Sequence, residues 1–221
     1  MLKPSAKVAS RIRTREKLIK AAKNLFAERG YDGTSVKEIA KAAKVNISLI
    51  SYHFDGKEGL YCECLSTIGN TRVRRTERIL THPASVEEFR VRLHLFVEEI
   101  FIAHLEEPEV SKIILRECEL QMPFTKEVFR ATFLKIYQNL VEFFNYGKDQ
   151  GWIRNEIDIE AAMGLFLGGI IHCAQKDWMN EMFFGRTMKD QKYREKLIAN
   201  AVTLCLDGCM TLPKPASRSS L

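Results

Sequence analysis

Residues 47–53 form a short segment whose side chains could contact the edges of DNA bases. Ser48 and Ser51 carry hydroxyls that donate and accept hydrogen bonds, and Ile47 can contact the methyl group of thymine. A helix that enters the major groove must be short, apolar on its inner face, and polar or small on its outer face. This segment fits that description and predicts a groove-reading helix, with an ordinary helical hairpin as the alternative.

The sequence does not show the residue spacings that are typical of a catalytic site or a metal site. The six cysteines lack the spacing of a disulfide framework. Cys205 and Cys209 share a helical face, but neither a histidine nor a second cysteine pair completes a metal site. We interpret all six as reduced core residues and predict no metal and no cofactor. The sequence also contains no phosphate-binding glycine loop and no nucleophile elbow, so an enzyme is the weaker alternative.

Positive charge is concentrated near the N-terminus. The net charge is +6, and residues 1–60 carry 13 Lys and Arg against 6 Asp and Glu. This asymmetry indicates a nucleic-acid or anionic-membrane contact at one end of the molecule, with a solvated basic tail as the alternative. Five of the cations precede residue 16 and predict an arm that contacts phosphates or the minor groove, or a solvated tail: Lys3, Lys7, Arg11, Arg13 and Arg15.

The composition favours a folded protein. The 221 residues are 46% hydrophobic and 10% aromatic, which suffices for a sizeable core and argues against disorder. The longest apolar run, residues 161–174, is too short for a bilayer span, and the N-terminus lacks an apolar signal segment. We therefore expect a soluble, cytoplasmic protein.

Helical periodicity extends over almost the whole chain. It predicts an all-α fold without strands and about nine helices, near residues 14–30, 36–43, 47–53, 57–80, 86–105, 109–120, 124–149, 159–179 and 190–211. Ser35 with Glu38 and Ser85 with Glu88 have the spacing of capping boxes, and Asn46 can cap the third helix. The break at residues 81–85 predicts a domain boundary.

The first sixty residues contain a recognisable pattern. It consists of Ala22-x3-Phe26-x3-Gly30-Tyr31-x2-Thr34-Ser35-Val36-x2-Ile39-Ala40-x2-Ala43, followed by Val45-Asn46, Ile50 and Tyr52-His53-Phe54-x2-Lys57-Glu58-x-Leu60-Tyr61. Over residues 14–61 this pattern resembles the DNA-binding domain of the tetracycline-repressor (TetR) family. The rest of the chain resembles the family only in its helical character and length.

The resemblance implies a role for each matching position. Phosphate contacts are implied for Thr34, Tyr52, His53 and Lys57, and base-edge contacts for Lys37, Ile47, Ser48 and Ser51. Many relatives have an aromatic residue at the position of Ser51, which puts that contact in doubt, and Gly56 replaces a capping residue. The alternatives are that Tyr52 is partly buried against the first helix, that His53 only bonds the backbone, and that Lys37 is only solvated.

The resemblance also implies a division into domains. A basic arm spans residues 1–13, a helix-turn-helix domain spans 14–61 with its fourth helix reaching about 80, a ligand-binding and dimerisation domain spans 62–211, and a flexible tail spans 212–221. For dimerisation we single out Gly164 and Gly168, which form a groove on the 159–179 helix unless they pack within the chain.

A pocket in the second domain is implied chiefly by the resemblance. Its expected lining is aromatic, namely Phe96, Phe101, Phe133, Tyr137 and Phe166, although aromatic residues at helical spacing also fill ordinary cores. The predicted function is a ligand-responsive repressor. It would bind a palindromic DNA operator as a homodimer and be released by a small apolar or amphipathic effector. The alternatives are an architectural, sequence-neutral DNA-binding protein and a helical enzyme.

Overall fold

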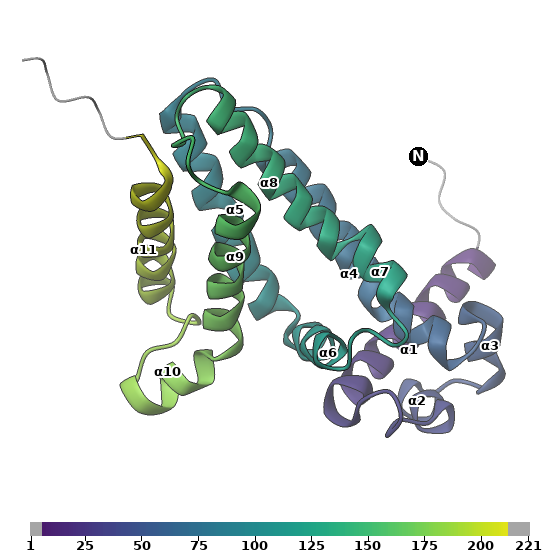
Figure 1. The fold of residues 1–221 in the computed structure, drawn as a ribbon. Coiled ribbons are helices and arrows are strands. Elements are labelled where there is room, and N and C mark those ends of the chain that lie inside the picture. Colours follow the sequence, from purple (N-terminus) through teal and green to yellow (C-terminus); the bar gives the residue numbers. More distant parts are fainter. Residues whose placement is uncertain (1–5, 212–221) are drawn as a thin grey trace, which may run out of the picture. The chain divides into compact units, whose positions relative to one another are not determined.

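The computed structural model describes residues 6–211, with side chains from residue 8 onward. These residues form helices without extended strands (Figure 1): α1 (Ala6–Arg29), α2 (Val36–Ala43), α3 (Ser48–Phe54), α4 (Lys57–Ile79), α5 (Val86–Glu106), α6 (Pro108–Glu119), α7 (Lys126–Ala131), α8 (Phe133–Asp149), α9 (Ile159–Gln175), α10 (Asp177–Phe184) and α11 (Gln191–Cys209). The all-α prediction is confirmed. The chain divides into two compact units, residues 1–73 with 106–134, and residues 74–105 with 135–221.

Local sequence signals set the boundaries of the helix-turn-helix. Ser35 and Glu38 form the predicted capping box at the start of α2, in which the Ser35 hydroxyl accepts from the Glu38 N–H and the Glu38 carboxylate accepts from the Ser35 N–H. These hydrogen bonds hold the pKa of Glu38 below its usual value. Lys44 ends α2 in the left-handed conformation, at φ 55°. The chain therefore turns sharply before α3.

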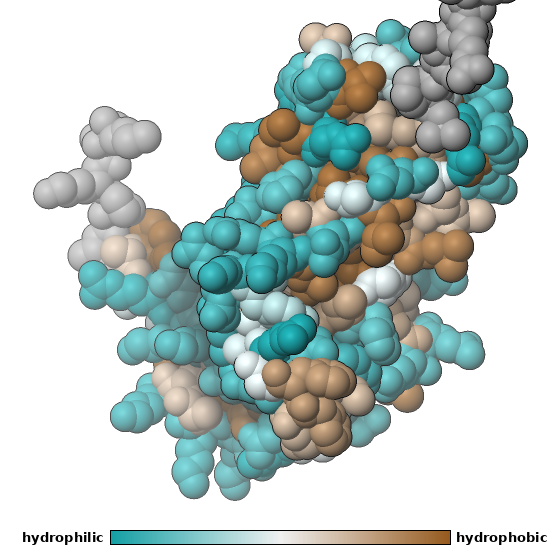
Figure 2. Space-filling view, turned by 90° about the vertical axis from the view of Figure 1, so that its left-hand side faces the viewer, coloured by the Kyte–Doolittle hydropathy of each residue, from teal (hydrophilic) through white to brown (hydrophobic). Residues whose placement is uncertain are grey.

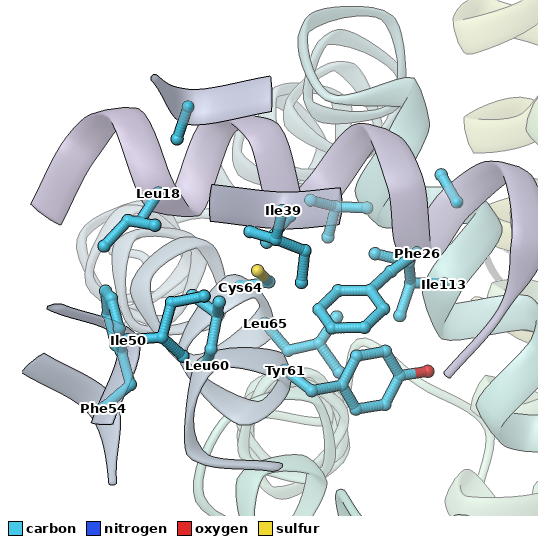
Figure 3. Packing of buried hydrophobic residues seen from close by; sticks show 14 of the residues in the cluster. Leu18, Phe26, Ile39, Ile50, Phe54, Leu60, Tyr61, Cys64, Leu65 and Ile113 are labelled. Carbon is cyan, nitrogen blue, oxygen red and sulfur yellow. The ribbon is translucent and has the colours of Figure 1, made fainter. Parts of the chain in front are cut away.

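The core of the first unit fixes the orientation of α3. Ile50 and Phe54 point from α3 into a cluster that contains Leu18 and Phe26 of α1 and Ile39 of α2 (Figure 3). Leu60, Tyr61, Cys64 and Leu65 of α4 complete its other side. Because only one face of α3 is anchored in this way, its opposite face is left to solvent.

The first unit also contains α6 and α7, which were expected in the second domain. Ile113 of α6 lies in the same core as Phe26 (Figure 3), and the Arg116 guanidinium donates a 2.8 Å hydrogen bond to the Phe26 carbonyl. Lys23 forms a 2.6 Å ion pair with Glu107. The compact units therefore differ from the predicted boundary at residues 81–85, because burial and polar contacts join residues 106–134 to the helix-turn-helix.

The N-terminal segment differs from the expected arm. Helix α1 begins at Ala6, so residues 6–13 are helical and the predicted flexible arm is wrong for them. No helix-breaking residue occurs between Ala6 and the predicted cap Thr14, whose hydroxyl instead bonds the Ser10 carbonyl one turn earlier at 3.0 Å. Residues 1–5 and the predicted tail, 212–221, lie outside the described part.

Helices α5 and α8 form the aromatic core of the second unit. Phe89 of α5 stacks on Phe143 of α8 with ring centroids 4.3 Å apart, and Phe144 meets Phe89 edge-on at 5.1 Å. Helices α9 and α11 lie side by side, with α10 at one end (Figure 1). An isolated antiparallel bridge between Ile153 and Met210 joins the α8–α9 connection to the end of α11.

Two of the nine predicted helices are each split in two. Residues 124–149 break at Thr132, which adopts φ −126° and ψ −78°. Residues 159–179 break before Asp177, whose buried carboxylate accepts hydrogen bonds from the Thr187 hydroxyl at 2.6 Å and the Met188 N–H at 2.9 Å. The first break is a local change of backbone angles and the second involves contacts from residues beyond the helix, and helical periodicity predicts neither of them.

None of the helices in residues 6–211 combines the length and apolar character that a transmembrane span requires.

Candidate nucleic-acid interface

The outward face of α3 carries small, polar and aromatic side chains. Ser48, Ser51 and Tyr52 are exposed, and Ile47, which precedes the helix, is 46% exposed. Ile50 and Phe54 on the opposite face are buried. The helix therefore presents hydroxyls and one apolar side chain to solvent from a rigid support, which is the arrangement needed to contact base edges in a major groove.

Asn46 sets the hydrogen-bonding role of Ser48. The Asn46 side-chain oxygen accepts from the Ser48 N–H at 2.9 Å and from the Ser48 hydroxyl at 2.8 Å. The asparagine thus stabilises the start of α3, which begins at Ser48 rather than at the expected residue 47. Since the Ser48 hydroxyl donates to Asn46, its lone pairs are what it offers to a base, and these suit the amino group of adenine or cytosine.

Tyr52 extends from the end of α3 toward solvent. Its side chain is 65% exposed, so most of it is open to solvent and only a part can be covered by α1. The guanidinium carbon of Arg11 lies 5.6 Å from its ring centroid, and that of Arg15 lies 5.4 Å from the Phe54 ring. Two cations of α1 therefore lie beside the end of α3, and their charge favours a phosphate at this position.

His53 is half-buried beside these cations. Its ring lies 5.0 Å from Tyr52 and 5.9 Å from Phe54. Partial burial lowers the pKa of His53, and the charges of Arg11 and Arg15 lower it further. In the free protein the imidazole is therefore held toward its neutral form, although a nearby phosphate would favour the charged form.

Lys57 is the first residue of α4. Its ammonium lies 4.2 Å from the centroid of the Tyr31 ring, a cation–π contact that holds the side chain near the start of the helix. Asp55 (φ 58°) and Gly56 (φ 107°) turn the chain between α3 and α4. Gly59 allows the two helices to approach closely, because a Cβ there would collide with the Phe54 carbonyl oxygen.

The expectation for Thr34 requires correction. Its side chain is 1% exposed, and its hydroxyl donates to the carbonyl of Gly30 at 2.8 Å and lies 3.2 Å from that of Leu25. Thr34 therefore connects the end of α1 to the start of α2, and its hydroxyl does not face a phosphate. The family pattern marks this position, but burial shows that its side chain has a structural role.

The remaining candidates fall into two groups. Lys37 is exposed on α2, so its base-edge contact stays a prediction beside the alternative that it is only solvated. Arg11 and Arg15 were placed in a general basic arm, whereas the structure brings them to Tyr52 and Phe54. Their spacing of four residues on a helix was the available signal, but it becomes informative only once α1 is known to start at Ala6.

The five predicted pocket residues are not brought together in a described cavity. Phe96 and Phe101 are fully buried, Tyr137 donates a 2.7 Å hydrogen bond to the Glu160 carbonyl, and Phe166 is half-buried. Phe133 belongs to the first unit and packs against Phe129 at 4.9 Å. Two hollows of the second unit have other linings: Glu77, Leu80, Thr81, His82, Asn139, Glu142 and Phe143 in one, and Arg90, Val91, His94, Leu95, Ala199, Val202 and Thr203 in the other.

Gly164 and Gly168 lie on an open face of α9. Both are exposed, and a Cβ added at Gly168 would meet no atom within 4 Å. At Gly164 the nearest atom would be the Tyr137 hydroxyl, at 3.9 Å. Packing within the chain therefore does not explain these two glycines, and that alternative is wrong for the described residues.

Comparisons with known proteins give a consistent result. The family model described as "Bacterial regulatory proteins, tetR family" matches residues 18–64. The "Probable HTH-type transcriptional regulator YttP" of Bacillus subtilis is 29% identical over 60% of this chain and 65% of its own length. The "Probable acrEF/envCD operon repressor" of Escherichia coli is 28% identical over 79% of this chain and 80% of its own length.

A solved structure shows the same fold. The transcriptional regulator FadR from Bacillus subtilis, in complex with stearoyl-CoA, superposes with a TM-score of 0.69 at 20% identity, over 87% of this chain and 98% of that one. The match of the helix-turn-helix segment and the shared arrangement of helices agree with the pattern of residues 14–61. Residues 18–64 therefore match the tetR family of bacterial regulatory proteins, and the chain as a whole shares the fold of solved TetR-family regulators.

Proposed function

We propose that the protein is a ligand-responsive transcriptional repressor that binds a palindromic operator as a homodimer. The observation that carries this proposal is the exposed face of α3, where Ser48, Ser51 and Tyr52 point outward while Ile50 and Phe54 are fixed in the core. Lys37 is exposed on α2, His53 and Lys57 lie at the end of α3 and the start of α4, and the cations Arg11 and Arg15 lie next to Tyr52 and Phe54. Contacts of this kind combine base recognition with sequence-independent attraction to phosphates.

Repression is proposed by analogy with the named relatives. One relative is named as a repressor of the acrEF/envCD operon, and the IcaR protein of Staphylococcus aureus, 43% identical over 47 residues, is named as a negative regulator. The IcaR match covers only 21% of this chain. The analogy with IcaR therefore concerns only the DNA-binding region. It does not extend to the genes that the protein regulates.

A homodimer is supported by an apolar face on the second unit. We use "the apolar face" for the exposed large side chains Leu165 and Ile171 of α9, Trp178, Met182, Phe183 and Phe184 of α10, and Leu204 of α11. Figure 2 views the side that carries α10 and α11, with apolar side chains gathered at its lower end. Leu165 is 81% and Leu204 76% exposed, values that favour a partner surface. Gly164 and Gly168 would let a partner helix approach closely.

The effector is proposed to bind the second unit and to act through α4. Residues 57–73 of this helix belong to the first unit and residues 74–79 to the second, so one element extends into both. Phe96, Phe101, Tyr137 and Phe166, which all belong to the second unit, remain the proposed contacts. The FadR structure contains stearoyl-CoA, which is consistent with an apolar or amphipathic effector for this chain.

A competition gel shift tests the proposal. The protein is bound to labelled DNA from upstream of its own gene and challenged with unlabelled copies of that DNA or with random DNA of the same length and composition. A specific repressor is displaced by far less of its own upstream DNA than of random DNA. Equal competition would instead identify a sequence-neutral architectural protein and would overturn the operator proposal.

A further inference from the structure

One hollow of the second unit lies between α5 and α11. Its volume is about 360 Å³, which lies in the range of small-molecule sites. Four consecutive-turn residues of α5 line it together with three residues of α11, and none of the aromatic side chains proposed above as effector contacts is among them. We use "the α5–α11 hollow" for this site, which is distinct from those aromatic contacts.

One stripe of α5 in the α5–α11 hollow is apolar. Val91 and Leu95 lie one helical turn apart and are 57% and 43% exposed. Val202, which lines the hollow from α11, is buried. An aliphatic chain that lies along this apolar stripe would remove it from water, and the removal of apolar surface from water favours binding.

The neighbouring stripe of α5 is basic. Arg90 and His94 are also one turn apart, and each directly precedes a residue of the apolar stripe. The Arg90 guanidinium lies 3.9 Å from the Met210 sulfur, a weak acceptor, and has no carboxylate partner among the described side chains. No Asp or Glu lines the hollow. An arginine fork can bind a carboxylate through two parallel hydrogen bonds, and a neutral imidazole supplies one more N–H donor.

We propose that the α5–α11 hollow binds a small amphipathic carboxylate, with its head group on the basic stripe and its aliphatic chain along the apolar stripe. An alcohol with the same chain lacks the charge that Arg90 recognises, and a short acid lacks the apolar part. The other hollow of the second unit is lined by two carboxylates, Glu77 and Glu142, which disfavour an anionic ligand. The charge of the lining therefore selects the α5–α11 hollow for this ligand.

A ligand suits this position better than a second copy of the chain. On α11 the apolar face proposed for dimerisation is represented by Leu204, which is 76% exposed. Successive residues of a helix are about 100° apart, so Leu204 lies about 100° around α11 from Thr203 and about 160° from Val202. The side of α11 that carries Leu204 is therefore not the side that lines the hollow.

Helix α5 is connected to the end of α4. The Arg92 guanidinium donates a 2.8 Å hydrogen bond to the carbonyl of Ile79, the last residue of α4. Arg75 of α4 forms a 3.1 Å ion pair with Glu99 of α5. A carboxylate that holds α5 against α11 thus acts on the helix that extends into both units. A role for this ligand as the effector rests on the proposed function, whereas its binding does not.

Calorimetric titration of the full-length protein without DNA tests the site. Sodium octanoate is the probe, octanol is the control that keeps the chain without the charge, and acetate is the control that keeps the charge without the chain. We expect octanoate to bind at one site per chain and about tenfold more tightly than either control, the difference typical of one charge-assisted hydrogen bond. Since no DNA is present, the result is independent of whether the chain is a repressor.

Two variants locate the ligand. Arg90→Gln keeps a polar side chain without the charge, and it should weaken octanoate binding about tenfold and leave octanol binding unchanged. Ala199→Leu should fill the hollow from α11 and weaken the binding of both ligands. The matched controls are Arg186→Gln and Asn200→Leu, exposed residues that do not line the hollow, and both should bind octanoate as the wild type does.

Three results would contradict the proposal or part of it. Absence of octanoate binding, or unchanged binding in both Arg90→Gln and Ala199→Leu, would overturn it. If octanoate does not bind and Leu95→Ser converts a dimer into a monomer in sedimentation, the hollow is instead an interface between copies of the chain. A gel shift with upstream DNA tests the effector role separately. Binding of octanoate to the free protein without release of that DNA would refute the effector role and leave the site confirmed.

Discussion

The phenol of Tyr61 donates a 2.8 Å hydrogen bond to the carboxylate of Glu117, and both side chains are 1% exposed. Glu117 also accepts a 2.6 Å hydrogen bond from the buried hydroxyl of Thr125. The carboxylate of α6 is thus connected to α4 and to the residue that precedes α7. Burial and this hydrogen bond raise the pKa of Tyr61, so the phenol remains a donor. This contact joins the helix-turn-helix region to residues 106–134 in one compact unit.

Tyr61→Phe removes the donor and leaves a buried carboxylate with one partner fewer. We expect the free energy of unfolding to fall by about 1–3 kcal/mol, measured by urea denaturation. Tyr52→Phe is the matched control, because the Tyr52 side chain is exposed and its replacement should leave stability unchanged. A double-mutant cycle with Glu117→Gln should give a positive coupling energy, and strictly additive losses would contradict a direct contact.

Phosphate and base contacts should respond differently to substitution. Tyr52→Ala and Lys57→Ala should weaken binding to operator and random DNA by similar factors, and Lys57→Ala should reduce the slope of log affinity against log salt by about 1. Ser48→Ala and Ser51→Ala should instead change the preferred base. Fluorescence anisotropy with a set of single-base operator variants makes the comparison, with exposed Lys196→Ala of α11 as the control. A uniform loss on every sequence from both serine variants would show that they do not contact bases.

DNA binding should strengthen as the pH falls toward the pKa of His53. In the free protein that pKa is lowered by partial burial and by Arg11 and Arg15. A phosphate near the ring would favour the imidazolium, so the complex takes up a proton that the free protein lacks. His53→Gln should lose this part of the pH dependence, measured as affinity across a pH series at constant salt. If His53→Gln keeps the pH dependence of the wild-type DNA affinity, a group other than His53 takes up the proton.

The same lowered pKa has the opposite consequence for folding. The unfolded chain binds a proton to His53 near pH 6.5, about the ordinary histidine pKa, before the folded protein does. The contribution of His53 to stability is therefore present above that pH and is lost as the pH falls toward the folded-state pKa. Urea denaturation of wild type and His53→Gln across this range separates the folding effect from the DNA effect.

Enlarging the α9 glycines should prevent dimerisation without unfolding the monomer. Gly168→Leu places a side chain in open space, and at Gly164 the nearest atom to a new Cβ would be 3.9 Å away. Sedimentation should therefore detect folded monomers. Gly147→Leu is the contrasting control, since a Cβ there would lie 2.9 Å from the Phe89 ring and should destabilise the fold itself. A wild-type chain that sediments as a monomer at micromolar concentration would contradict the dimer.

Effector and operator should oppose each other's binding. A ligand that binds more tightly when α4 is in one position than in another shifts the protein toward the first position. The ratio of its affinities for the two positions sets how far it can change the affinity of the protein for the operator. The expected coupling is about 1–3 kcal/mol, or about 5–150-fold in affinity, and linkage requires the operator to weaken effector binding by the same factor. Calorimetric titration of an identified effector with and without operator measures this factor. Equal affinities would show that the effector site is not coupled to the DNA-binding region.

The sequence by itself determined the helical fold and the location of the helix-turn-helix. The Ser35–Glu38 capping box consists of hydrogen bonds between residues three apart, so the sequence shows it directly. The helical spacing of apolar residues such as Leu18, Phe26 and Ile39 likewise indicates which side of each helix is buried. The exposed positions of Ser48, Ser51 and Tyr52 follow from the same periodicity. These features could be predicted because residues three or four apart on a helix share a face.

Only the tertiary structure decided which distant residues meet. Thr34 is buried by the end of α1, Arg11 reaches Tyr52, and Arg154 reaches Cys209 through the connection that follows α8. The contact between Tyr61 and Glu117 spans 56 residues and places α6 with the DNA-binding helices. Such contacts depend on how whole helices pack, and helical periodicity identifies the face that is buried but not the helix that covers it.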